Sequence, residues 1–498
     1  MATTSNVQSN THYVGTLVGE STSREFRLAV AHETIREQDI IAVDAELRQS
    51  GLGTKSEKIR VWAKVQKIER LNPLFPSEAG HELAATKTDP FDTVLSLSRE
   101  MVTAVCQVLG AELLEQGETK GKLDHVRYPP QPASSAYMPN SEDIARIVLG
   151  ELREKQQRAL DIATLSNRPE VSVKVNGHAI VTRHLAILAM TGAGKSWTAR
   201  KVIEELSAKN YPIVIFDPHG DYTGLADIPG LKGRVKRYFA QFPIFEQSPE
   251  TVVSVVESLG WQLAKTHRSM FDDLFKGAKD FISITDNLKE KTNWLSDYLN
   301  NSKIKEFGIK PNLFFVADFV QAIITAGKEQ DDKAFEKISE WCNHEFKITK
   351  QIASWLETLP NNLRVAAKRL YQMETISQKV AKTTEALPSD RKQLVQYGTV
   401  SIVALAGYTS DFQATIYRLI AEDIFTAKVS NELKLPVVLL LEEAHNFAPA
   451  HANTPAELSS IAVTKQIAQE GRKFNIGLIL ISQRPSRLDE TTLSQCNS

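Results

Sequence analysis

The chain has 498 residues, of which 42% are hydrophobic and 24% are charged, a composition typical of a soluble globular protein with a large core. As a prior, this length suggests about three domains. The formal net charge of −1 excludes a protein that attracts nucleic acid through an overall basic field, so any such contact has to come from a local patch or from the lumen of an assembly.

The sequence carries no signal for export or for a membrane. Its cysteines, Cys106, Cys342 and Cys496, are widely separated, so they predict neither a disulfide framework nor a metal cluster and fit a reducing compartment. No apolar run approaches the roughly 18–20 residues that span a bilayer. The N-terminus, MATTSNVQSNTH, is polar and lacks an apolar signal core. We therefore expect a cytoplasmic protein without a membrane segment.

Short strands fill the N-terminal part of the sequence. From about residue 13 to residue 110, the runs VGTLV, FRLAV, IIAV, VWAKVQKI and MVTAVCQVLG are separated by charged or turn-like stretches. Several short strands with alternating faces predict a small barrel or sandwich. We therefore predict an N-terminal β-barrel domain at residues 1–125. Proline-rich stretches at residues 124–143 and a helical pattern from Ile144 to about Leu160 predict a linker and a helix at residues 126–170.

Five near-continuous apolar runs mark the remaining part, residues 171–498. They are HLAILA, PIVIFD, VSIVAL, PVVLLLEE and IGLILISQ, and the segments between them show helical spacing. Such runs are typical of parallel strands covered on both faces. The predicted fold is an α/β core with a doubly wound parallel sheet. Between about residues 245 and 397 helical patterns replace the strand signal, which predicts a helical insertion in this core.

A glycine-rich stretch, AMTGAGKS at residues 189–196, lies between a predicted strand and a predicted helix. This context is the one in which a P-loop binds phosphate, and it disfavours a chance glycine turn. Lys195 is predicted to contact the β- and γ-phosphates of ATP, and the Ser196 hydroxyl to join the Mg²⁺ shell. The motif usually begins with glycine where Ala189 stands, and alanine is tolerated if φ there is negative. The predicted nucleotide-binding residues are Thr191, Gly192, Ala193, Gly194, Lys195, Ser196 and Trp197.

Two adjacent carboxylates, Glu442 and Glu443, end the apolar run that starts at Val437. ATP hydrolysis needs one carboxylate in the Mg²⁺ shell and another that polarises the attacking water. Neighbours within a strand point to opposite faces, but at a strand's end the first can face the metal and the second the γ-phosphate. We predict Glu442 as the Mg²⁺ ligand and Glu443 as the general base. Most such strands carry aspartate first, and an exposed acidic turn is the alternative interpretation.

Further polar residues flank the predicted strands. Asp217, in FDPHGD, ends the strand after the P-loop helix, and because the carboxyl ends of parallel strands form the ligand crevice, it is predicted beside Mg²⁺ or the attacking water. His219 in the same stretch is more often a loop residue than a catalyst. Gln483 closes the last strand and fits a sensor of the γ-phosphate, with a loop-start glutamine as the alternative. Arg183 precedes the P-loop strand and is predicted to reach the nucleotide in its own subunit.

Arg472, in EGRK, lies between the acidic strand and the final strand. The charge of the transition state is often stabilised by an arginine from a neighbouring subunit. Arg472 is our candidate for this role. A surface salt bridge is the alternative, and Lys465, Gln469 and Lys473 are competing donors.

The motifs HLAILAMTGAGKS, VIFDPHGDY, LLLEEAHNFAP and EGRKFNIGLILISQRPSRLDE, preceded by a small β-domain, resemble the HerA family in the HerA/FtsK branch of P-loop ATPases. The resemblance covers nearly the whole chain. It implies an α/β P-loop NTPase fold with a RecA-like (ASCE) parallel sheet, in a homo-hexamer whose ring threads double-stranded DNA. It implies Arg183 as the cis arginine, Asp217 as the acidic residue after the P-loop helix and Gln483 as the sensor. The implied partner is a NurA-like nuclease in DNA-end processing, or a sirtuin-like or nuclease effector in anti-phage defence.

Three functions remain open on the sequence. The first is an ATP-driven DNA translocase or helicase, which would rely on a partner for cutting because no nuclease motif is evident. The second is a nucleotide-switched ring scaffold that activates an effector with little motor activity. The third is a secretion or conjugation ATPase, which the lack of a membrane run disfavours. Relatives continue past the position at which this chain stops, Ser498, so we expect a truncated C-terminus. The densest basic run is 232–237, although a charge run is usually a solvated face.

Overall fold

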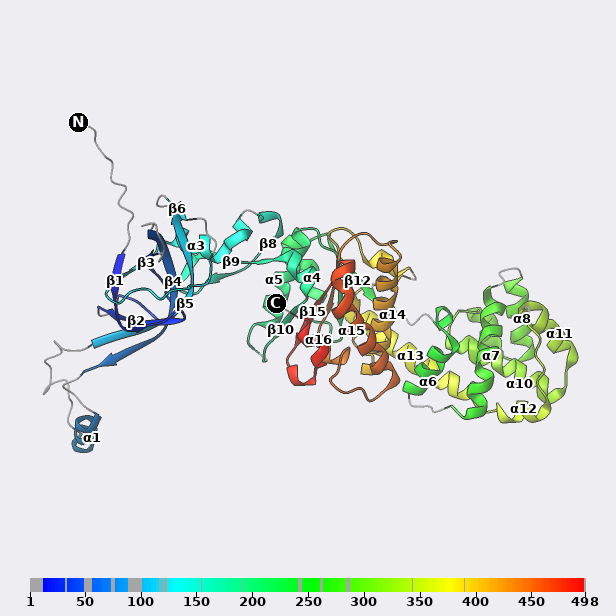
Figure 1. Cartoon of the computed structure of the whole chain (residues 1–498). Coiled ribbons are helices and arrows are strands. Elements are labelled where there is room, and N and C mark those ends of the chain that lie inside the picture. The colour runs from blue at the N-terminus through cyan, green and yellow to red at the C-terminus, as the bar shows by residue number, and fades with distance from the viewer. Residues whose placement is uncertain are drawn as a thin grey trace. The chain divides into compact units, whose positions relative to one another are not determined.

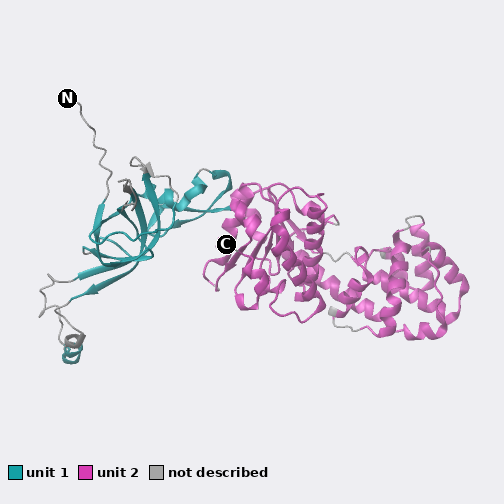
Figure 2. Ribbon diagram, in the orientation of Figure 1, with its two compact units in different colours: residues 1–176 teal, residues 177–498 magenta. Residues whose placement is uncertain are grey.

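The computed structural model describes residues 12–31, 34–48, 56–72, 77–87, 101–115, 118–119, 123–153, 155–190, 192–240, 244–259, 263–283, 287–342, 344–388 and 390–496. The chain divides into two compact units, Met1–Asn176 and Gly177–Ser498, which Figure 2 shows in teal and magenta. Within the described residues, no helix combines the length and the apolar character needed to cross a membrane.

The first unit is built around an antiparallel sheet that closes on itself (Figure 1). The strand order is β2-β1-β7-β3-β4-β5-β6, and β2 pairs with both β1 and β5. Along β2, Phe26 and Leu28 are buried while Glu25 and Arg27 are exposed, as expected where one face lines the barrel interior. The predicted N-terminal β-barrel is therefore confirmed. Its elements are β1 (His12–Ser21), β2 (Glu25–Val30), β3 (Ile40–Arg48), β4 (Ser56–Leu71), α1 (Ser77–Thr86), β5 (Met101–Glu115), β6 (Glu118–Thr119) and β7 (Ser135–Met138).

The segment predicted as a linker and helix, residues 126–170, is more ordered than its prolines indicated. It contributes β7, which pairs with β1 and β3 and buries Ala136 in the barrel core. The expected helix is shorter because Gly150 adopts a φ of 47° and ends it. Ile144 of this helix packs with Trp62 of the barrel and Val171, so the unit extends to Asn176. The elements are α3 (Ser141–Leu149), η2 (Gly150–Arg153), η3 (Gln156–Arg158), β8 (Ala159–Leu165) and β9 (Arg168–Asn176).

The second unit contains a six-stranded, all-parallel sheet in the order β10-β15-β14-β11-β13-β12. The five predicted apolar runs form five of these strands, and the α/β P-loop fold is confirmed. The central strands are completely buried, which explains their unbroken apolar character. The strands are β10 (Leu185–Leu188), β11 (Ile213–Asp217), β12 (Val235–Phe239), β13 (Val400–Ala404), β14 (Val437–Leu441) and β15 (Ile476–Ser482).

The sequence prediction missed β12, whose residues are VKRYF. This strand lies at the edge of the sheet, where charged side chains are tolerated. Lys236 and Arg237 are half-buried and donate hydrogen bonds to Gln396 Oε1 and to the Thr223 carbonyl. Much of the densest basic run therefore serves packing within the fold.

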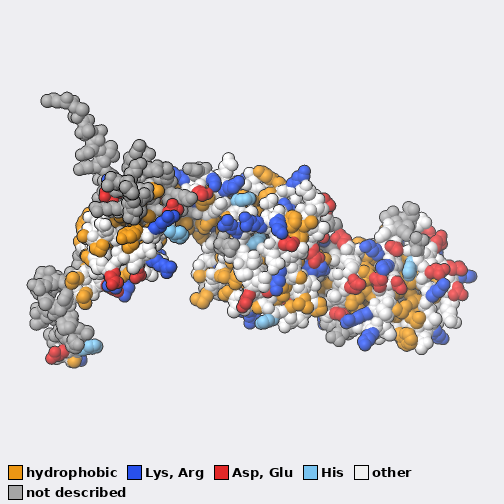
Figure 3. All heavy atoms as spheres, in the orientation of Figure 1, with side chains coloured by type: hydrophobic (Ala, Val, Ile, Leu, Met, Phe, Trp, Pro, Cys, Tyr) orange, Lys and Arg blue, Asp and Glu red, His pale blue; other side chains and the backbone are white. Residues whose placement is uncertain are grey.

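Helices connect or flank the strands of the second unit. They are α4 (Gly177–Arg183), α5 (Lys195–Ala208), α14 (Ser410–Val429), α15 (Pro455–Phe474) and α16 (Glu490–Ser494), with short 3₁₀ turns η4 (Thr223–Asp227), η5 (Pro229–Leu231), η6 (Ile244–Glu246), η7 (Arg391–Leu394), η8 (Ala444–Asn446) and η9 (Pro485–Arg487). On the face seen in Figure 3, cationic and anionic side chains are interspersed, consistent with a net charge near zero.

The predicted helical insertion is present between β12 and β13. An aromatic cluster centred on Phe281, with Phe319 and Trp341, holds its helices together. The last helix, α13, also packs on the sheet, and Ser377 on it donates a hydrogen bond to the Ala404 carbonyl. The insertion helices are α6 (Pro249–Ser258), α7 (Lys265–Ser283), α8 (Leu288–Tyr298), α9 (Ser302–Phe307), α10 (Leu313–Glu329), α11 (Asp332–Cys342), α12 (Lys350–Trp355) and α13 (Leu359–Ala381).

Candidate active site

The glycine loop between β10 and α5 has the backbone geometry of a phosphate cradle. Gly192 and Gly194 adopt φ values of 84° and 87°, a region that L side chains rarely occupy. Ala193 donates its N–H to the Met190 carbonyl over 3.2 Å and closes the turn. Gly194 is the N-cap of α5 and offers no side chain to its first N–H groups, which leaves these donors for an anion.

The remaining loop residues can be placed relative to this cradle. Ala189 does not have a positive φ, so the backbone accepts alanine where the general motif has glycine. Ser196 is exposed, and the Trp197 side chain is 65% exposed beside it. Thr191 lies outside the described residues.

Lys195 contacts both predicted catalytic carboxylates. Its Nζ donates to Glu442 Oε1 over 2.9 Å and to Glu443 Oε1 over 3.0 Å, and all three side chains are largely buried. Burial alone would lower the pKa of Lys195, but the hydrogen bonds and charges of the two glutamates raise it above its ordinary value. The lysine therefore carries its positive charge here, as the neutralising partner of two adjacent anions.

Glu443 is held in an unusual conformation directly after β14. Its φ of 47° lies in the left-handed region, which is strained for a glutamate and bends the chain at the strand's end. This bend explains how neighbouring side chains meet the same ammonium group despite strand alternation. Glu443 Oε2 is buried and has no hydrogen-bond partner. Its nearest cationic candidate, His445 Nδ1, is 3.4 Å away, and burial lowers the pKa of that histidine.

Glu442 is more firmly held than its neighbour. Its Oε1 accepts from Lys195, and its Oε2 accepts a 2.6 Å hydrogen bond from the Tyr222 hydroxyl. Burial raises the pKa of Glu442, although the bonds from Tyr222 and Lys195 oppose that shift. Tyr222 was not among the sequence-predicted site residues, although it closes the quoted motif VIFDPHGDY.

Asp217 is the last residue of β11, and its buried carboxylate accepts hydrogen bonds from backbone N–H groups. Oδ1 accepts the N–H groups of His219, Gly220 and Asp221, and Oδ2 accepts that of Tyr222. Burial raises the pKa of Asp217 against the effect of these bonds. Asp217 thus shapes the loop that carries Tyr222, and within the described part of the chain its carboxylate forms no hydrogen bond or ion pair with Lys195, Glu442 or Glu443.

The end of β15 lies beside the P-loop strand. Ser482 pairs with Leu188, and its carbonyl accepts the N–H of Ala189 over 3.4 Å. The Ser482 hydroxyl lies 3.4 Å from His445 Nδ1. Gln483 follows directly after β15 and is half-buried, and its sensor role stays a prediction. Ser482 and His445 lie within two of the quoted motifs but were not predicted as site residues, because the sequence does not show that the two side chains meet.

Arg183 and Arg472 lie near the amino ends of the strands, whereas the candidate site lies at the carboxyl ends. Arg183 ends α4 before the amino end of β10, and about 13 Å of strand separates it from the P-loop. Arg183 and the P-loop therefore lie at opposite ends of β10, and a contact of Arg183 with the nucleotide of its own chain stays a prediction. Arg472 is exposed, and it lies about 25 Å along α15 from the start of that helix. His184 links the two regions, because its Nε2 lies 3.0 Å from the Ala468 carbonyl.

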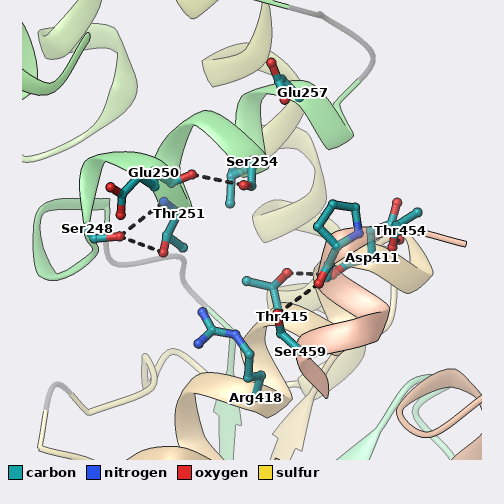
Figure 4. Close-up of a pocket in the computed structure, with 13 residues that line it drawn as sticks. Ser248, Glu250, Thr251, Ser254, Glu257, Asp411, Thr415, Arg418, Thr454 and Ser459 are labelled. Atoms are coloured by element: carbon teal, nitrogen blue, oxygen red, sulfur yellow. Dashed lines mark hydrogen bonds between the residues drawn. The ribbon is translucent and has the colours of Figure 1, made fainter. Parts of the chain in front are cut away.

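A pocket of about 570 Å³ lies elsewhere, between the N-terminal ends of α6, α14 and α15 (Figure 4). Its hydroxyl groups are used by the helices that carry them. Ser248 caps α6 by accepting the Thr251 N–H, and Thr454 donates to Asp411 Oδ1 while it caps α15. None of the sequence-predicted site residues lines this pocket.

The chain is similar in sequence to several proteins that are named as helicases or probable helicases. A family model described as helicase HerA, central domain, matches residues 160–424, more than half of the chain. The chain is 27% identical to the probable helicase MJ1565 of Methanocaldococcus jannaschii over 387 residues, 76% of this chain and 62% of the relative. It is 26% identical to the DNA double-strand break repair helicase HerA of Pyrococcus furiosus over 377 residues, 72% of this chain and 62% of the relative.

A third relative, the probable helicase MJECL08 of Methanocaldococcus jannaschii, is 24% identical over 504 residues, 98% of this chain and 86% of the relative. The chain thus spans less than two thirds of the first two relatives and most of the third. With the P-loop cradle, the buried glutamate pair and the family match on residues 160–424 taken together, the chain belongs to the HerA helicase central-domain family.

Proposed function

We propose that this protein is an ATPase that uses ATP hydrolysis to move double-stranded DNA, as a translocase or helicase. The observation that carries the proposal is the contact of one P-loop lysine, Lys195, with two buried adjacent glutamates. A lysine that binds phosphate and a carboxylate that activates water are the two groups that phosphoryl transfer to water requires. The names of the HerA relatives support DNA as the partner.

The residues around the cradle fit ATP and Mg²⁺. The N–H groups of Gly192–Gly194 and the first turn of α5 would hold phosphate oxygens, and Ser196 with Glu442 would hold the metal. Bound Mg²⁺ neutralises charge that develops on the phosphate oxygens. The buried, unpartnered Glu443 Oε2 is an acceptor without a donor, and an attacking water would supply one. Glu443 would orient that water and take its proton.

When phosphate enters the cradle, Lys195 has to leave the glutamates for the phosphate oxygens. Its departure removes the hydrogen bond that Lys195 donates to Glu443 Oε1 and releases this carboxylate. The site is thus restrained without nucleotide and becomes competent when nucleotide draws the ammonium group away. Gln483, at the end of β15, would report the state of the γ-phosphate from the edge beside the P-loop.

We further propose a homo-hexameric ring in which Arg472 acts on the nucleotide of a neighbouring subunit. Arg472 lies near the end of α15, at the amino ends of the strands, whereas the P-loop lies at their carboxyl ends. This position supports a role between subunits. The same position makes Arg183 a second candidate for this role. In this proposal the barrel at residues 1–125 helps the ring assemble, and the core at residues 171–498 hydrolyses ATP to move DNA. The ring works with a partner, either a NurA-like nuclease or a sirtuin-like defence effector.

The test is ATP turnover by the purified chain with and without linear double-stranded DNA, together with displacement of a protein roadblock from that DNA. DNA-stimulated turnover and roadblock displacement would support the motor. An ATP turnover rate that does not change with DNA but changes when the partner effector is added would support a nucleotide-switched scaffold instead. Absence of turnover under all these conditions would overturn the ATPase proposal.

A further inference from the structure

We propose that Tyr222 is a positioning residue that holds Glu442 in place for Mg²⁺ while Lys195 moves between the glutamates and the nucleotide. This inference rests on the proposed ATPase function and assigns a task to a residue outside the P-loop and the acidic pair. In the absence of Tyr222, nothing on the described chain besides Lys195 would restrain the Glu442 carboxylate.

The contact itself is short and fully enclosed. Tyr222 is 1% exposed and Glu442 is 1% exposed, and the phenol donates to Oε2 over 2.6 Å. The phenol is the donor of this bond, because an ionised carboxylate can only accept. A hydrogen bond from a neutral donor to a buried carboxylate is among the stronger kinds in proteins.

The loop from Asp217 to Tyr222 fixes the backbone position from which the phenol side chain extends. Asp217 holds four successive N–H groups of the loop, including that of Tyr222 itself. Gly220 adopts a φ of 87° against α13, and a Cβ there would lie 2.5 Å from Val380 Cγ1. The loop is therefore rigid at both ends, and Tyr222 presents its hydroxyl from a scaffold that does not depend on Lys195.

This arrangement makes the two glutamates unequal. Glu442 has one partner on each oxygen, Lys195 and Tyr222, whereas Glu443 has Lys195 on Oε1 and no hydrogen-bond partner on Oε2. When Lys195 turns to phosphate, Glu442 stays oriented and Glu443 becomes free to bind water. Tyr222 therefore decides which carboxylate holds the metal and which serves as the base.

The experiment compares Tyr222→Phe with Tyr408→Phe in the full chain. Tyr408 is also a buried phenol, but it donates to the Ala240 carbonyl away from the glutamates. Mn²⁺ is titrated by electron paramagnetic resonance with a saturating non-hydrolysable ATP analogue present. Tyr222→Phe should raise the Mn²⁺ concentration at half-saturation about tenfold. Tyr408→Phe should leave it unchanged, and affinity for the analogue without metal should be the same in both.

A double-variant cycle separates positioning from a general loss of structure. In a Glu442→Gln background, Tyr222→Phe should weaken Mn²⁺ no further, because the group that it positions is already removed. Equal weakening in both backgrounds, or wild-type Mn²⁺ affinity in Tyr222→Phe, would overturn the inference and leave the ATPase proposal standing. If the wild-type chain binds neither the analogue nor Mn²⁺, both fall together.

Discussion

The ammonium group of Lys195 lies 3.0 Å from Glu443 Oε1, so the predicted phosphate ligand and the predicted general base are in direct contact. In the proposed function, nucleotide and Glu443 compete for the same cation. Binding of phosphate would then break a buried ion pair, and this exchange would link the arrival of ATP to the release of the base.

Glu443→Gln removes one side of this competition. We expect ATP hydrolysis to fall by about 10²-fold or more, because an amide cannot take a proton from water. Nucleotide affinity should stay the same or increase, since the neutral side chain holds Lys195 less tightly. Single-turnover hydrolysis and equilibrium nucleotide binding measure the two effects. Glu470→Gln on α15 is the matched control, and a variant that loses binding together with hydrolysis would contradict this assignment.

Lys195→Ala leaves two adjacent buried carboxylates without their cation. We expect hydrolysis to be lost and the second unit to be destabilised by about 3–5 kcal/mol, because an unpaired buried charge is costly. Thermal unfolding measures the change. Lys201→Ala, on the same helix, removes a more exposed pair with Glu205 and should have little effect. If both variants unfold at the same temperature, the Lys195 pair does not stabilise the fold.

The role of Arg472 can be tested by mixing two inactive variants. Arg472→Ala should bind nucleotide but hydrolyse it slowly, since transition-state charge loses its partner. Mixed with Glu443→Gln, it should recover part of its activity, because the second variant supplies an intact Arg472 to a neighbour with an intact base. Arg183→Ala, mixed in the same way, is the comparison. Failure of Arg472→Ala to recover in mixtures would assign Arg472 to its own subunit or to the surface.

His184 makes the stability of the second unit depend on pH. Its Nδ1 accepts the Leu478 N–H over 2.9 Å, and burial lowers the pKa of His184 in the native state from the ordinary 6.5. Below pH 6.5 the unfolded chain binds a proton that the native site resists. The contribution of His184 is therefore complete above that pH and is lost as the pH falls through the lowered native value.

This prediction is checked by urea unfolding at pH 7.5 and pH 5.5. His184→Gln should be less stable than wild type at pH 7.5, because Leu478 loses its acceptor, but the difference should shrink at pH 5.5. A difference that stays constant between the two pH values would show that His184 does not titrate with folding.

The first unit has its own buried charge pair. Glu112 is 3% exposed and accepts hydrogen bonds from Trp62 Nε1 and Arg146 Nη1. Arg146→Met should cost about 3–5 kcal/mol by leaving that carboxylate unpaired. Hydrogen exchange in β4 and β5 measures the loss. Adding Glu112→Gln should recover part of it, whereas Lys155→Met, which breaks an exposed pair with Glu151, should change little.

Local patterns determined the architecture. The apolar runs of β11, β13, β14 and β15 are readable because a parallel strand buried on both faces has to be apolar throughout. The P-loop is equally local, since the strand, the glycines and the helix start lie within a few residues of each other. The sequence did not predict β12, because an edge strand can carry charged residues such as Lys236 and Arg237. It did not predict β7, because a short strand between prolines resembles a loop.

The relations between distant residues were decided only in the folded chain. Tyr222 and Glu442 are 220 positions apart, and no spacing rule connects them. They meet because β11 and β14 are hydrogen-bonded neighbours whose carboxyl ends share one edge. The same sheet geometry sends Arg183 and Arg472 to the other edge. The sequence by itself thus determined which groups are available for chemistry, and the order and direction of the strands decided which of them meet.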